Sequence, residues 1–360
     1  MKESIKVRLT LEDGTVCYGK SFGAPVSSAG EVVFNTAMTG YPESLTDPSY
    51  RGQILCLTYP LVGNYGAPAK NEENNLFSFY ESSSIHISGL IVSDYSFEYS
   101  HWNAAESLDE WLKRNNVPGV YGIDTRALTR RIREKGAMLG KLEPEGMNTG
   151  FYDPNKTNLV AEVSTRSIKK YGSGRYRILL VDCGVKYNII RNLLRRDTTI
   201  IRVPWDYDYH LEEFDGLFLT NGPGDPKMCV ETINNIKRSL DGSKPVFGIC
   251  LGNQLMALAS GADTYKLKYG HRSHNQPVLL AGTDKAFITS QNHGFAVDNA
   301  TLAEDWEPYF ININDNTNEG MKHKFKPFFS TQFHPEASGG PTDTDFLFDD
   351  FIENIKKSLS

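Results

Sequence analysis

The feature that most constrains the fold is an alternation of apolar runs and helical segments after residue 175. Ile178–Val181 is a continuous apolar run, as expected of a strand that is covered on both faces of a parallel sheet. The elements expected after it are a helix at Tyr187–Arg196, strands at Thr199–Val203 and Gly216–Leu219, a helix at Cys229–Leu240, a strand at Val246–Gly248 and a helix at Gly252–Ser260. This order predicts βαβ units and an α/β fold with a doubly wound, mostly parallel sheet. Active sites in such sheets lie at the carboxyl ends of the strands.

The 360 residues are enough for two domains and a joint between them. Residues 1–145 show short apolar runs broken by turn residues, a hairpin signal at Asp13-Gly14, and helical patterns at Ser107–Asn115 and Thr125–Lys135. We expect a mixed α/β domain there. Residues 146–175 are rich in Gly, Asn, Thr and Ser and are interpreted as a linker, so the second domain is expected at 176–360.

Composition excludes several classes of function. The net charge is -6 and no basic block occurs, which makes nucleic acid a poor partner. No run approaches the roughly 20 apolar residues of a membrane span, and the start of the chain does not resemble a signal peptide, so no membrane association is expected. The five cysteines have no C-x-x-C spacing, which argues against a disulfide framework and a metal site and favours a reducing, cytoplasmic location.

Cys250 lies where a strand gives way to a helix. It follows the apolar run that ends at Ile249, and Gly248 and Gly252 flank it in the G-x-C-x-G form of a nucleophile elbow. The helix N-terminus favours negative charge on the sulfur, and the N–H of Leu251 can stabilise an oxyanion. A lone cysteine before a helix is more often a structural residue, but the paired glycines favour a nucleophile.

A thiol nucleophile needs a base, and His334 is the candidate. It follows a strand expected at Phe328–Phe333, at the same edge of the sheet. Glu336 is two residues further on, and i and i+2 side chains point to one side of an extended segment, so its carboxylate can orient the imidazole. By itself, Glu336 is equally readable as a solvated surface charge.

A glycine-rich loop, TNGPGDP at residues 220–226, follows the strand Gly216–Leu219. Gly222 and Gly224 let the backbone approach a ligand, and their N–H groups could complete an oxyanion hole with Leu251. A plain tight turn fits the composition equally well. The loop lacks the spacing and the Lys-Ser/Thr pair of a phosphate-binding loop.

These three pieces, in this order, resemble the class I (triad) glutamine amidotransferases. The matching motifs are NGPGDP, GICLGNQ and HPE. The resemblance implies a flavodoxin-like glutaminase domain in which Cys250, His334 and Glu336 form the catalytic triad. It implies hydrolysis of L-glutamine to glutamate and ammonia through a cysteinyl thioester.

Four further segments resemble the small subunits of carbamoyl phosphate synthetases. They are GEVVFNTAMTGYPESLTDPSYRGQI (30–54), LTYPLVGNYG (57–66), GIDTRALTRRIREKGAM (122–138) and QNHGFAVD (291–298). The first three lie in the amino-terminal region, which other glutaminases of the class lack. The resemblance therefore covers nearly the whole chain and identifies the acceptor chemistry.

The resemblance also implies a set of contacts to glutamine and to the oxyanion, which are Ser49, Gly222, Gly224, Leu251, Gln254, Asn292, Gly294 and Phe295. Gln254 lies one helical turn after Cys250, so its amide can face the same pocket. Ser49 could equally close a turn, and His293 is interpreted as structural. Asn253 departs from the family motif, which usually has His there; this affects the tuning of the pocket and not the reaction class.

The implied function is the glutaminase half-reaction of carbamoyl phosphate synthesis for the pyrimidine and arginine pathways. The chain has no P-loop or ATP-grasp region, so no cofactor is expected in it. ATP, the nucleotide-binding sites and Mg²⁺ are expected on a large synthetase subunit, its partner in a heterodimer or a higher oligomer. Two alternatives stay open: a class I glutaminase that serves another synthetase, and a non-catalytic regulatory subunit.

Overall fold

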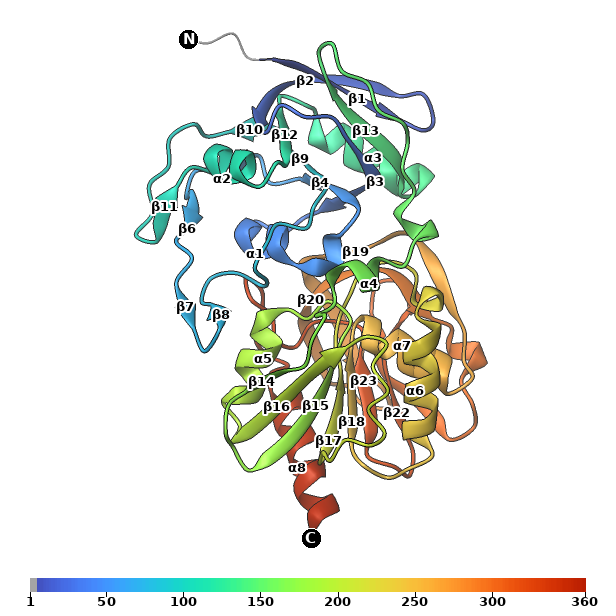
Figure 1. Cartoon of the computed structure of the whole chain (residues 1–360). Coiled ribbons are helices and arrows are strands. Elements are labelled where there is room, and N and C mark those ends of the chain that lie inside the picture. Colours follow the sequence, from blue (N-terminus) through green and yellow to red (C-terminus); the bar gives the residue numbers. More distant parts are fainter. Residues whose placement is uncertain (1–4) are drawn as a thin grey trace. The chain divides into compact units, whose positions relative to one another are not determined.

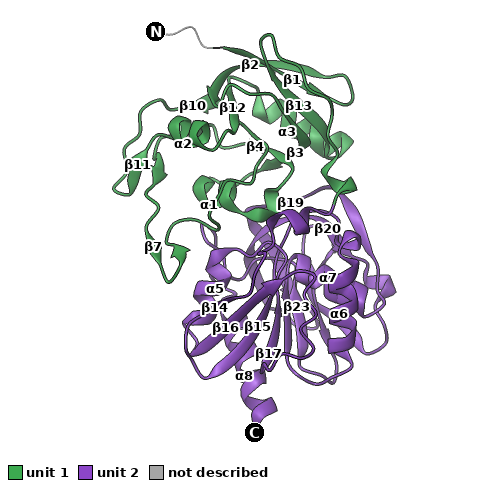
Figure 2. Cartoon of the chain, in the orientation of Figure 1, with its two compact units in different colours: residues 1–157 green, residues 158–360 purple. Residues whose placement is uncertain are grey.

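The computed structural model describes residues 5–360. These residues divide into two compact units: unit 1 ends at residue 157 and unit 2 comprises residues 158–360 (Figure 2). The division falls inside the stretch that the sequence predicts as a linker. Each unit has its own apolar core. Within residues 5–360, no helix is long and apolar enough to cross a membrane.

Unit 1 is built on a closed barrel of seven strands (Figure 1). Around the barrel the order is β1 (Lys6–Leu11), β13 (Met138–Pro144), β3 (Ser28–Asn35), β4 (Gln53–Leu57), β9 (Gly89–Ile91), β12 (Pro118–Tyr121) and β2 (Val16–Gly23). The strands β3, β4, β9 and β12 run parallel to one another, and the other pairings are antiparallel. Closure leaves this sheet without exposed edges.

Three helices accompany the barrel: α1 (Tyr41–Thr46), α2 (Leu108–Arg114) and α3 (Thr125–Lys135). The last two match the helices expected from the sequence. Ser107 and Glu110 form a capping box at the start of α2, and the Asp124 carboxylate accepts from the Ala127 N–H at the start of α3. The small pairs β5 (Leu61–Val62) with β10 (Asp94–Tyr95), β6 (Ala67–Pro68) with β11 (Ala104–Glu106), and β7 (Glu72–Glu73) with β8 (Leu76–Phe77) complete the unit.

Unit 2 is built on a sheet of ten strands. In order across the sheet they are β14 (Lys169–Tyr171), β16 (Thr198–Pro204), β15 (Tyr176–Asp182), β17 (Gly216–Leu219), β18 (Val246–Ile249), β23 (Phe328–Thr331), β22 (Asn318–His323), β21 (Trp306–Asn312), β19 (Thr264–Leu280) and β20 (Ala286–Val297). The run from β16 to β23 is parallel, as predicted. The other pairings are antiparallel and include the long β19–β20 hairpin, which the sequence interpretation did not contain.

Helices cover both faces of the parallel strands, which confirms the doubly wound α/β class (Figure 1). The helices of the unit are α4 (Leu159–Val163), α5 (Tyr187–Leu194), α6 (Val230–Leu240), α7 (Leu251–Ala259) and α8 (Phe346–Leu359). Ile236 of α6 and Leu255 of α7 share one apolar cluster with alternate residues of β15 and β17. On the other face, Phe348 and Phe351 of α8 pack on Phe218 of β17. Such burial on both faces explains the continuous apolar runs of these strands.

Candidate active site

Four adjacent parallel strands of unit 2, in the order β15, β17, β18 and β23, end at the same edge of the sheet. The segments that follow them supply Lys186, the loop with Gly222 and Gly224, Cys250, and the His334–Glu336 segment. Sheet topology thus assembles groups that are far apart in the chain.

Cys250 has the backbone geometry of a nucleophile elbow. Its φ is 54° and its ψ is -103°, a conformation that a residue with a Cβ rarely adopts. The strand and the helix hold it there, because its N–H donates to the Thr331 carbonyl at 2.7 Å and α7 begins at the next residue. Only 2% of Cys250 is exposed. Strain of this kind persists where the surrounding structure fixes it, and it is common at functional sites.

The flanking glycines are required by close packing of the backbone. Neither Gly248 nor Gly252 has a positive φ, so the turn itself does not demand them. A Cβ on Gly248 would lie 2.7 Å from the Gly252 carbonyl carbon, and a Cβ on Gly252 would lie 2.3 Å from the Leu219 carbonyl oxygen. Glycine at both positions therefore lets α7 pack directly against β17 and β18.

His334 and Glu336 contact each other as predicted, although the local backbone differs from the prediction. β23 ends at Thr331, and Glu336 lies in a turn and not in an extended segment. The His334 Nδ1 is nevertheless 2.6 Å from Glu336 Oε1, and both residues are 2% exposed. An ionised carboxylate accepts hydrogen bonds only, so Nδ1 carries the proton and Nε2 is directed elsewhere.

The electrostatics of this pair favour a protonated imidazole. Burial is the largest single influence and opposes the charged ring, and Lys186 opposes it too. The Glu336 carboxylate and the Cys250 sulfur together outweigh both, so that the pKa of His334 is raised to about 10. The influence of the sulfur on the ring means that thiol and imidazole lie near each other, as a nucleophile and its proton acceptor must.

Lys186 is a buried member of the site that the sequence interpretation missed. Its Nζ lies 2.9 Å from Glu336 Oε1 and donates to the Ala337 carbonyl at 2.8 Å. Burial works against ionised Glu336, but Lys186 and then His334 outweigh it and lower the pKa of this carboxyl to about 2. The one available sequence signal was the position of Lys186 just after the buried strand β15.

The glycine loop lies beside the elbow. A Cβ on Gly222 would meet the Cys183 carbonyl oxygen at 2.1 Å and the Leu251 side chain at 2.7 Å, so no side chain fits there. Gly224 has a φ of 84°. The Leu251 N–H is the first of α7 and has no acceptor within the helix. The loop and the start of α7 are therefore positioned to supply backbone donors near the sulfur, and their role as an oxyanion hole stays a prediction.

Gln254 and the β20 segment border the same site. Gln254 Nε2 donates to the Phe295 carbonyl at 2.9 Å, and the Cys250 sulfur lies 3.7 Å from the Asn292 carbonyl oxygen. Gly294 lies between Asn292 and Phe295 on β20. The structure thus brings these predicted glutamine contacts around Cys250, while the contacts themselves remain predictions.

Ser49 belongs to unit 1, unlike every other predicted site residue. It lies in the short 3-10 turn Pro48–Tyr50, where its N–H donates to the Asp47 carboxylate at 2.9 Å. The turn-closing role that the sequence left open is therefore present. A contact between Ser49 and glutamine stays a prediction.

His271, His293 and Glu319 form a group that could hold a metal ion in geometric terms, with ligand atoms within 4.8 Å of one another. The group is already linked by hydrogen bonds. His271 contacts Glu319 at 3.3 Å and Asp315 at 2.8 Å, and these carboxylates offset its burial and raise its pKa to about 9. A charged imidazole cannot bind a metal, so the arrangement favours an ion-paired cluster over a metal site.

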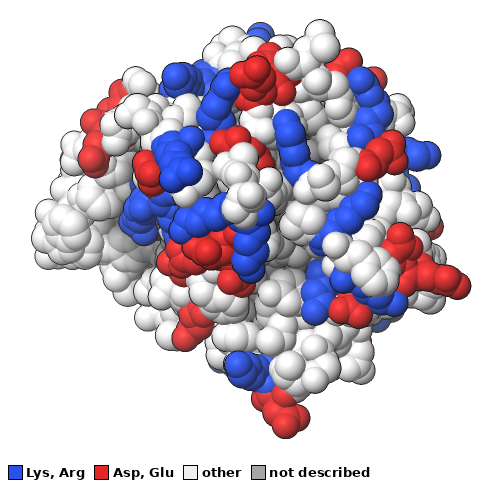
Figure 3. Space-filling view, turned by 90° about the horizontal axis from the view of Figure 1, so that it is seen from below, with Lys and Arg blue, Asp and Glu red and all other residues white. Residues whose placement is uncertain are grey.

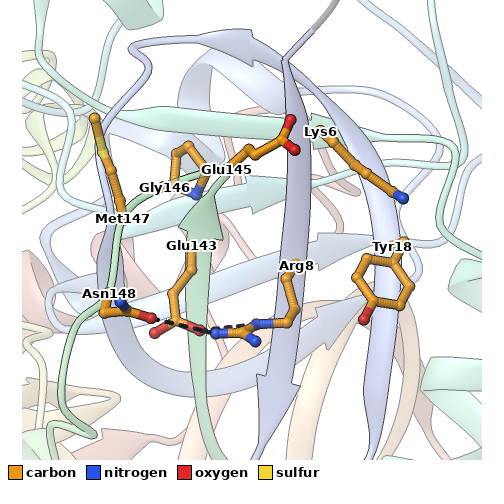
Figure 4. Close-up of a pocket in the computed structure, with 9 residues that line it drawn as sticks. Lys6, Arg8, Tyr18, Glu143, Glu145, Gly146, Met147 and Asn148 are labelled. Atoms are coloured by element: carbon orange, nitrogen blue, oxygen red, sulfur yellow. Dashed lines mark hydrogen bonds and ion pairs between the residues drawn. The ribbon is translucent and has the colours of Figure 1, made fainter.

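A pocket of about 360 Å³ on the barrel of unit 1 contains none of the predicted site residues (Figure 4). Arg8 crosses the pocket and pairs with Glu143 at 2.8 Å, so the charges of these two side chains compensate each other. On the face of the molecule in Figure 3, basic and acidic side chains are interspersed and do not form a field of one sign. Neither feature offers a nucleophile or an alternative site.

Comparison with known proteins agrees with this geometry. Residues 9–142 match the family model described as carbamoyl-phosphate synthase small chain, CPSase domain. Residues 179–354 match the model of class I glutamine amidotransferases. A solved glutamine amidotransferase from Thermotoga maritima aligns with 52% of this chain and 85% of its own, at 21% identity and a TM-score of 0.40. That score is too low to support the fold, which rests on the strand order above.

Curated relatives resemble the whole chain. The carbamoyl-phosphate synthase [ammonia], mitochondrial, of Aquarana catesbeiana is 53% identical over 97% of this chain, but the chain spans only 24% of that relative's length. The carbamoyl phosphate synthase arginine-specific small chain of Aspergillus fumigatus is 49% identical over 98% of this chain and 80% of its own length. With both domain models matched in order and a small chain aligned over most of its length, the chain belongs to the family of carbamoyl phosphate synthase small chains.

Proposed function

We propose that this chain hydrolyses L-glutamine and supplies the ammonia to a synthetase that makes carbamoyl phosphate. The observation that carries the proposal is the strained Cys250 at the start of α7, together with the buried His334–Glu336 pair at the neighbouring strand end. A structural cysteine would not need a φ of 54°. Membership in the small-chain family supports carbamoyl phosphate synthesis as the reaction that consumes the ammonia.

The Cys250 thiolate attacks the side-chain carbonyl carbon of glutamine. The resulting oxyanion is held by the N–H groups of Leu251 and of the Gly222–Gly224 loop. His334, protonated through its pairing with Glu336, gives its proton to the amide nitrogen; the C–N bond then breaks, ammonia leaves and the glutamyl group remains on Cys250 as a thioester. His334 then takes a proton from water, and the hydroxide attacks the thioester carbon; the C–S bond breaks, which releases glutamate and restores the Cys250 thiolate beside the protonated His334.

The charges of the site suit this cycle. Lys186 and Glu336 are buried and paired, and an imidazolium beside a thiolate adds a second compensated pair. The four charges sum to zero, so the reactive ion pair need not create net charge in a buried site. Losing one oxyanion donor from such a site typically costs on the order of 10²–10³ in rate.

The partner is proposed to be a large synthetase polypeptide or region that binds ATP, Mg²⁺ and bicarbonate. No phosphate-binding motif occurs in the present sequence, which supports the placement of that chemistry elsewhere. Ammonia is mostly ammonium near neutral pH and is then not nucleophilic, so delivery through an enclosed path has a physical motive. We propose a cytoplasmic location for the pair, supported by the absence of any paired cysteine among the described residues.

The test is carbamoyl phosphate formation by the chain and its cognate synthetase, with ATP and bicarbonate, from glutamine or from added ammonia. We expect Cys250→Ser to abolish synthesis from glutamine and to leave synthesis from ammonia intact. If the wild type hydrolyses glutamine without forming carbamoyl phosphate, a glutaminase that serves another synthetase is the better assignment. If Cys250 forms no thioester and the wild type hydrolyses nothing, the chain is a regulatory subunit.

A further inference from the structure

A fully enclosed row of polar side chains lies behind Gln254. Gln254 Nε2 donates to Gln332 Oε1 at 3.0 Å, and Asn253 Nδ2 donates to the same oxygen at 3.1 Å. Ser330 Oγ in turn donates to Asn253 Oδ1 at 2.7 Å. Gln332, Asn253 and Ser330 are each 0% exposed, and none of them belongs to the triad.

The direction of every hydrogen bond in this row is fixed by one backbone group. The Phe295 carbonyl can only accept, so the nitrogen of the Gln254 amide must face it at 2.9 Å. The same nitrogen then faces Gln332, so Gln332 must present its oxygen. Asn253 must therefore present its nitrogen to that oxygen, which leaves its own oxygen for the Ser330 hydroxyl.

Gln332 keeps this orientation at a cost. Its Nε2 is buried and has no hydrogen-bond partner among the described residues. A buried, unpartnered amide donor is unfavourable, so the two donors that converge on Oε1 must outweigh it. The orientation of the Gln332 amide is therefore set by hydrogen bonds from Gln254 and Asn253, and not by the hydrogen bonding of its own nitrogen.

The consequence concerns Gln254. Both of its amide hydrogens are used, one by Phe295 and one by Gln332, while its Oε1 makes no hydrogen bond within the part of the chain that the structure describes. Gln254 follows Cys250 by one helical turn, so the two side chains lie on the same side of α7. An amide oxygen can only accept a hydrogen bond, so Gln254 presents an acceptor beside the proposed nucleophile. L-glutamine offers donors of the matching kind in its carboxamide N–H₂ and its α-ammonium.

We propose that Gln332 and Asn253 are positioning residues that lock the Gln254 amide, so that its oxygen accepts a hydrogen bond from a nitrogen of the bound glutamine. The inference rests on the proposed glutaminase activity. Gln332 and Asn253 act through Gln254 and do not touch the substrate. The polarity of Asn253 matters more than its identity, because a neutral imidazole can also accept from Ser330 with one nitrogen and donate to Gln332 with the other.

The experiment is steady-state glutamine hydrolysis by the full chain with its synthetase partner, for the wild type, Gln332→Met, Gln254→Met and the double variant. We expect Gln332→Met to raise the KM for glutamine about 10-fold, the effect of one hydrogen bond, with kcat changed far less. In the Gln254→Met background the same change should have almost no further effect, because the residue through which it acts is gone. Gln276→Met is the matched control, since its Oε1 accepts one side-chain amide bond outside the row.

The Asn253 variants supply a second readout if Gln332→Met does not fold. Asn253→Leu should raise the KM, and Asn253→His should keep it within about 3-fold, because the donor and the acceptor are retained. Binding of L-glutamine to each variant, combined with Cys250→Ser and measured by calorimetry, should weaken in step with the KM.

The outcomes separate the two proposals. If the wild type does not hydrolyse glutamine, the proposed function fails, and the row of amides has no substrate to position. If the wild type is active but Gln332→Met leaves the KM unchanged, or raises it equally in both backgrounds, the positioning role is wrong and the glutaminase stands. Equal KM values for Asn253→Leu and Asn253→His would also overturn it.

Discussion

Both units contain a run of adjacent parallel strands, but the residues at the carboxyl ends of these strands differ in kind. The run comprises four strands in the barrel (β3-β4-β9-β12) and five in the open sheet (β16-β15-β17-β18-β23). After β3 in the barrel, Asn35 donates to the Tyr50 hydroxyl at 2.8 Å and accepts from the Ala37 N–H, which closes the turn. After β18 in the sheet, the chain passes through a strained cysteine.

The comparison teaches that strand order creates a place for chemistry but does not supply it. Parallel strands bring their carboxyl ends together in both units. At the end of β3 in unit 1, the Asn35 side chain bonds the local backbone and a tyrosine hydroxyl, whereas in unit 2 Lys186, Glu336 and His334 form a buried set of charges. Function therefore follows the side chains at the edge and not the sheet itself.

The largest difference between the two units is expected when one cysteine in each of them is replaced by serine. Cys250→Ser should lower glutamine hydrolysis by roughly 10⁴-fold or more, because the nucleophile is lost. Cys17→Ser, in the barrel strand β2, should leave the rate within about 2-fold, since this half-buried cysteine belongs to the other unit and is not one of the proposed site residues. Equal losses in the two variants would mean that cysteine chemistry is not what distinguishes the units.

Glu336→Gln should give the next largest effect, about 10²–10⁴-fold in kcat, because the imidazole loses the group that orients and charges it. The charges around His334 also determine the direction in which its pKa changes in this variant. Without the carboxylate, burial and Lys186 both disfavour the imidazolium, so the pKa of His334 must fall from its raised value of about 10. Nitrogen NMR of the ring, titrated in both proteins, measures it; an unchanged pKa would contradict the assigned pairing.

A pair of lysine substitutions compares buried carboxylates in the two units. Lys186→Met should destabilise unit 2 by about 3–5 kcal/mol, because it leaves an uncompensated charge in a closed site. Lys141→Met should cost unit 1 about 1 kcal/mol or less, because this lysine is partly exposed and Glu143 keeps Arg8 at 2.8 Å. Urea unfolding followed by hydrogen exchange resolves the two units, and the reverse ranking would show that the charges of unit 2 are not a balanced set.

A smaller effect is expected in acid. The pKa of Glu336 is lowered from 4.5 to about 2 in the folded protein, so its contribution to stability is complete above pH 4.5 and is lost as the pH falls from 4.5 toward 2. Glu336→Gln should remove this part of the acid dependence. The free energy of unfolding, measured for both proteins between pH 6 and pH 3, should converge as the pH falls; parallel curves would mean that Glu336 is not ionised in the fold.

Local patterns predicted much of the fold. The helix at Thr125–Lys135 and the strand at Gly216–Leu219 have the expected bounds, and the triad candidates meet in one site. These succeeded because periodicity, capping and the strand-to-helix turn are properties of short segments. Closure of the barrel was not predicted, because short strands do not reveal their partners.

The missed parts depend on neighbours that are distant in the chain. The β19–β20 hairpin was hidden because its strands carry bulges and charged residues that interrupt the alternation. Lys186 reaches Glu336 across 150 residues, and Gln332 reaches Gln254 across 78. Each is an ordinary polar residue until the order of the strands places it beside its partner.

The positive φ of Cys250 has a consequence for anyone who redesigns this protein. Glycine would occupy that conformation with less strain, so a procedure that rewards only a lower folding energy would favour replacing the proposed nucleophile. The backbone conformation at this position favours glycine, whereas the proposed reaction requires a thiol there. A stabilised variant should therefore be optimised everywhere except at the residue that the backbone tolerates least.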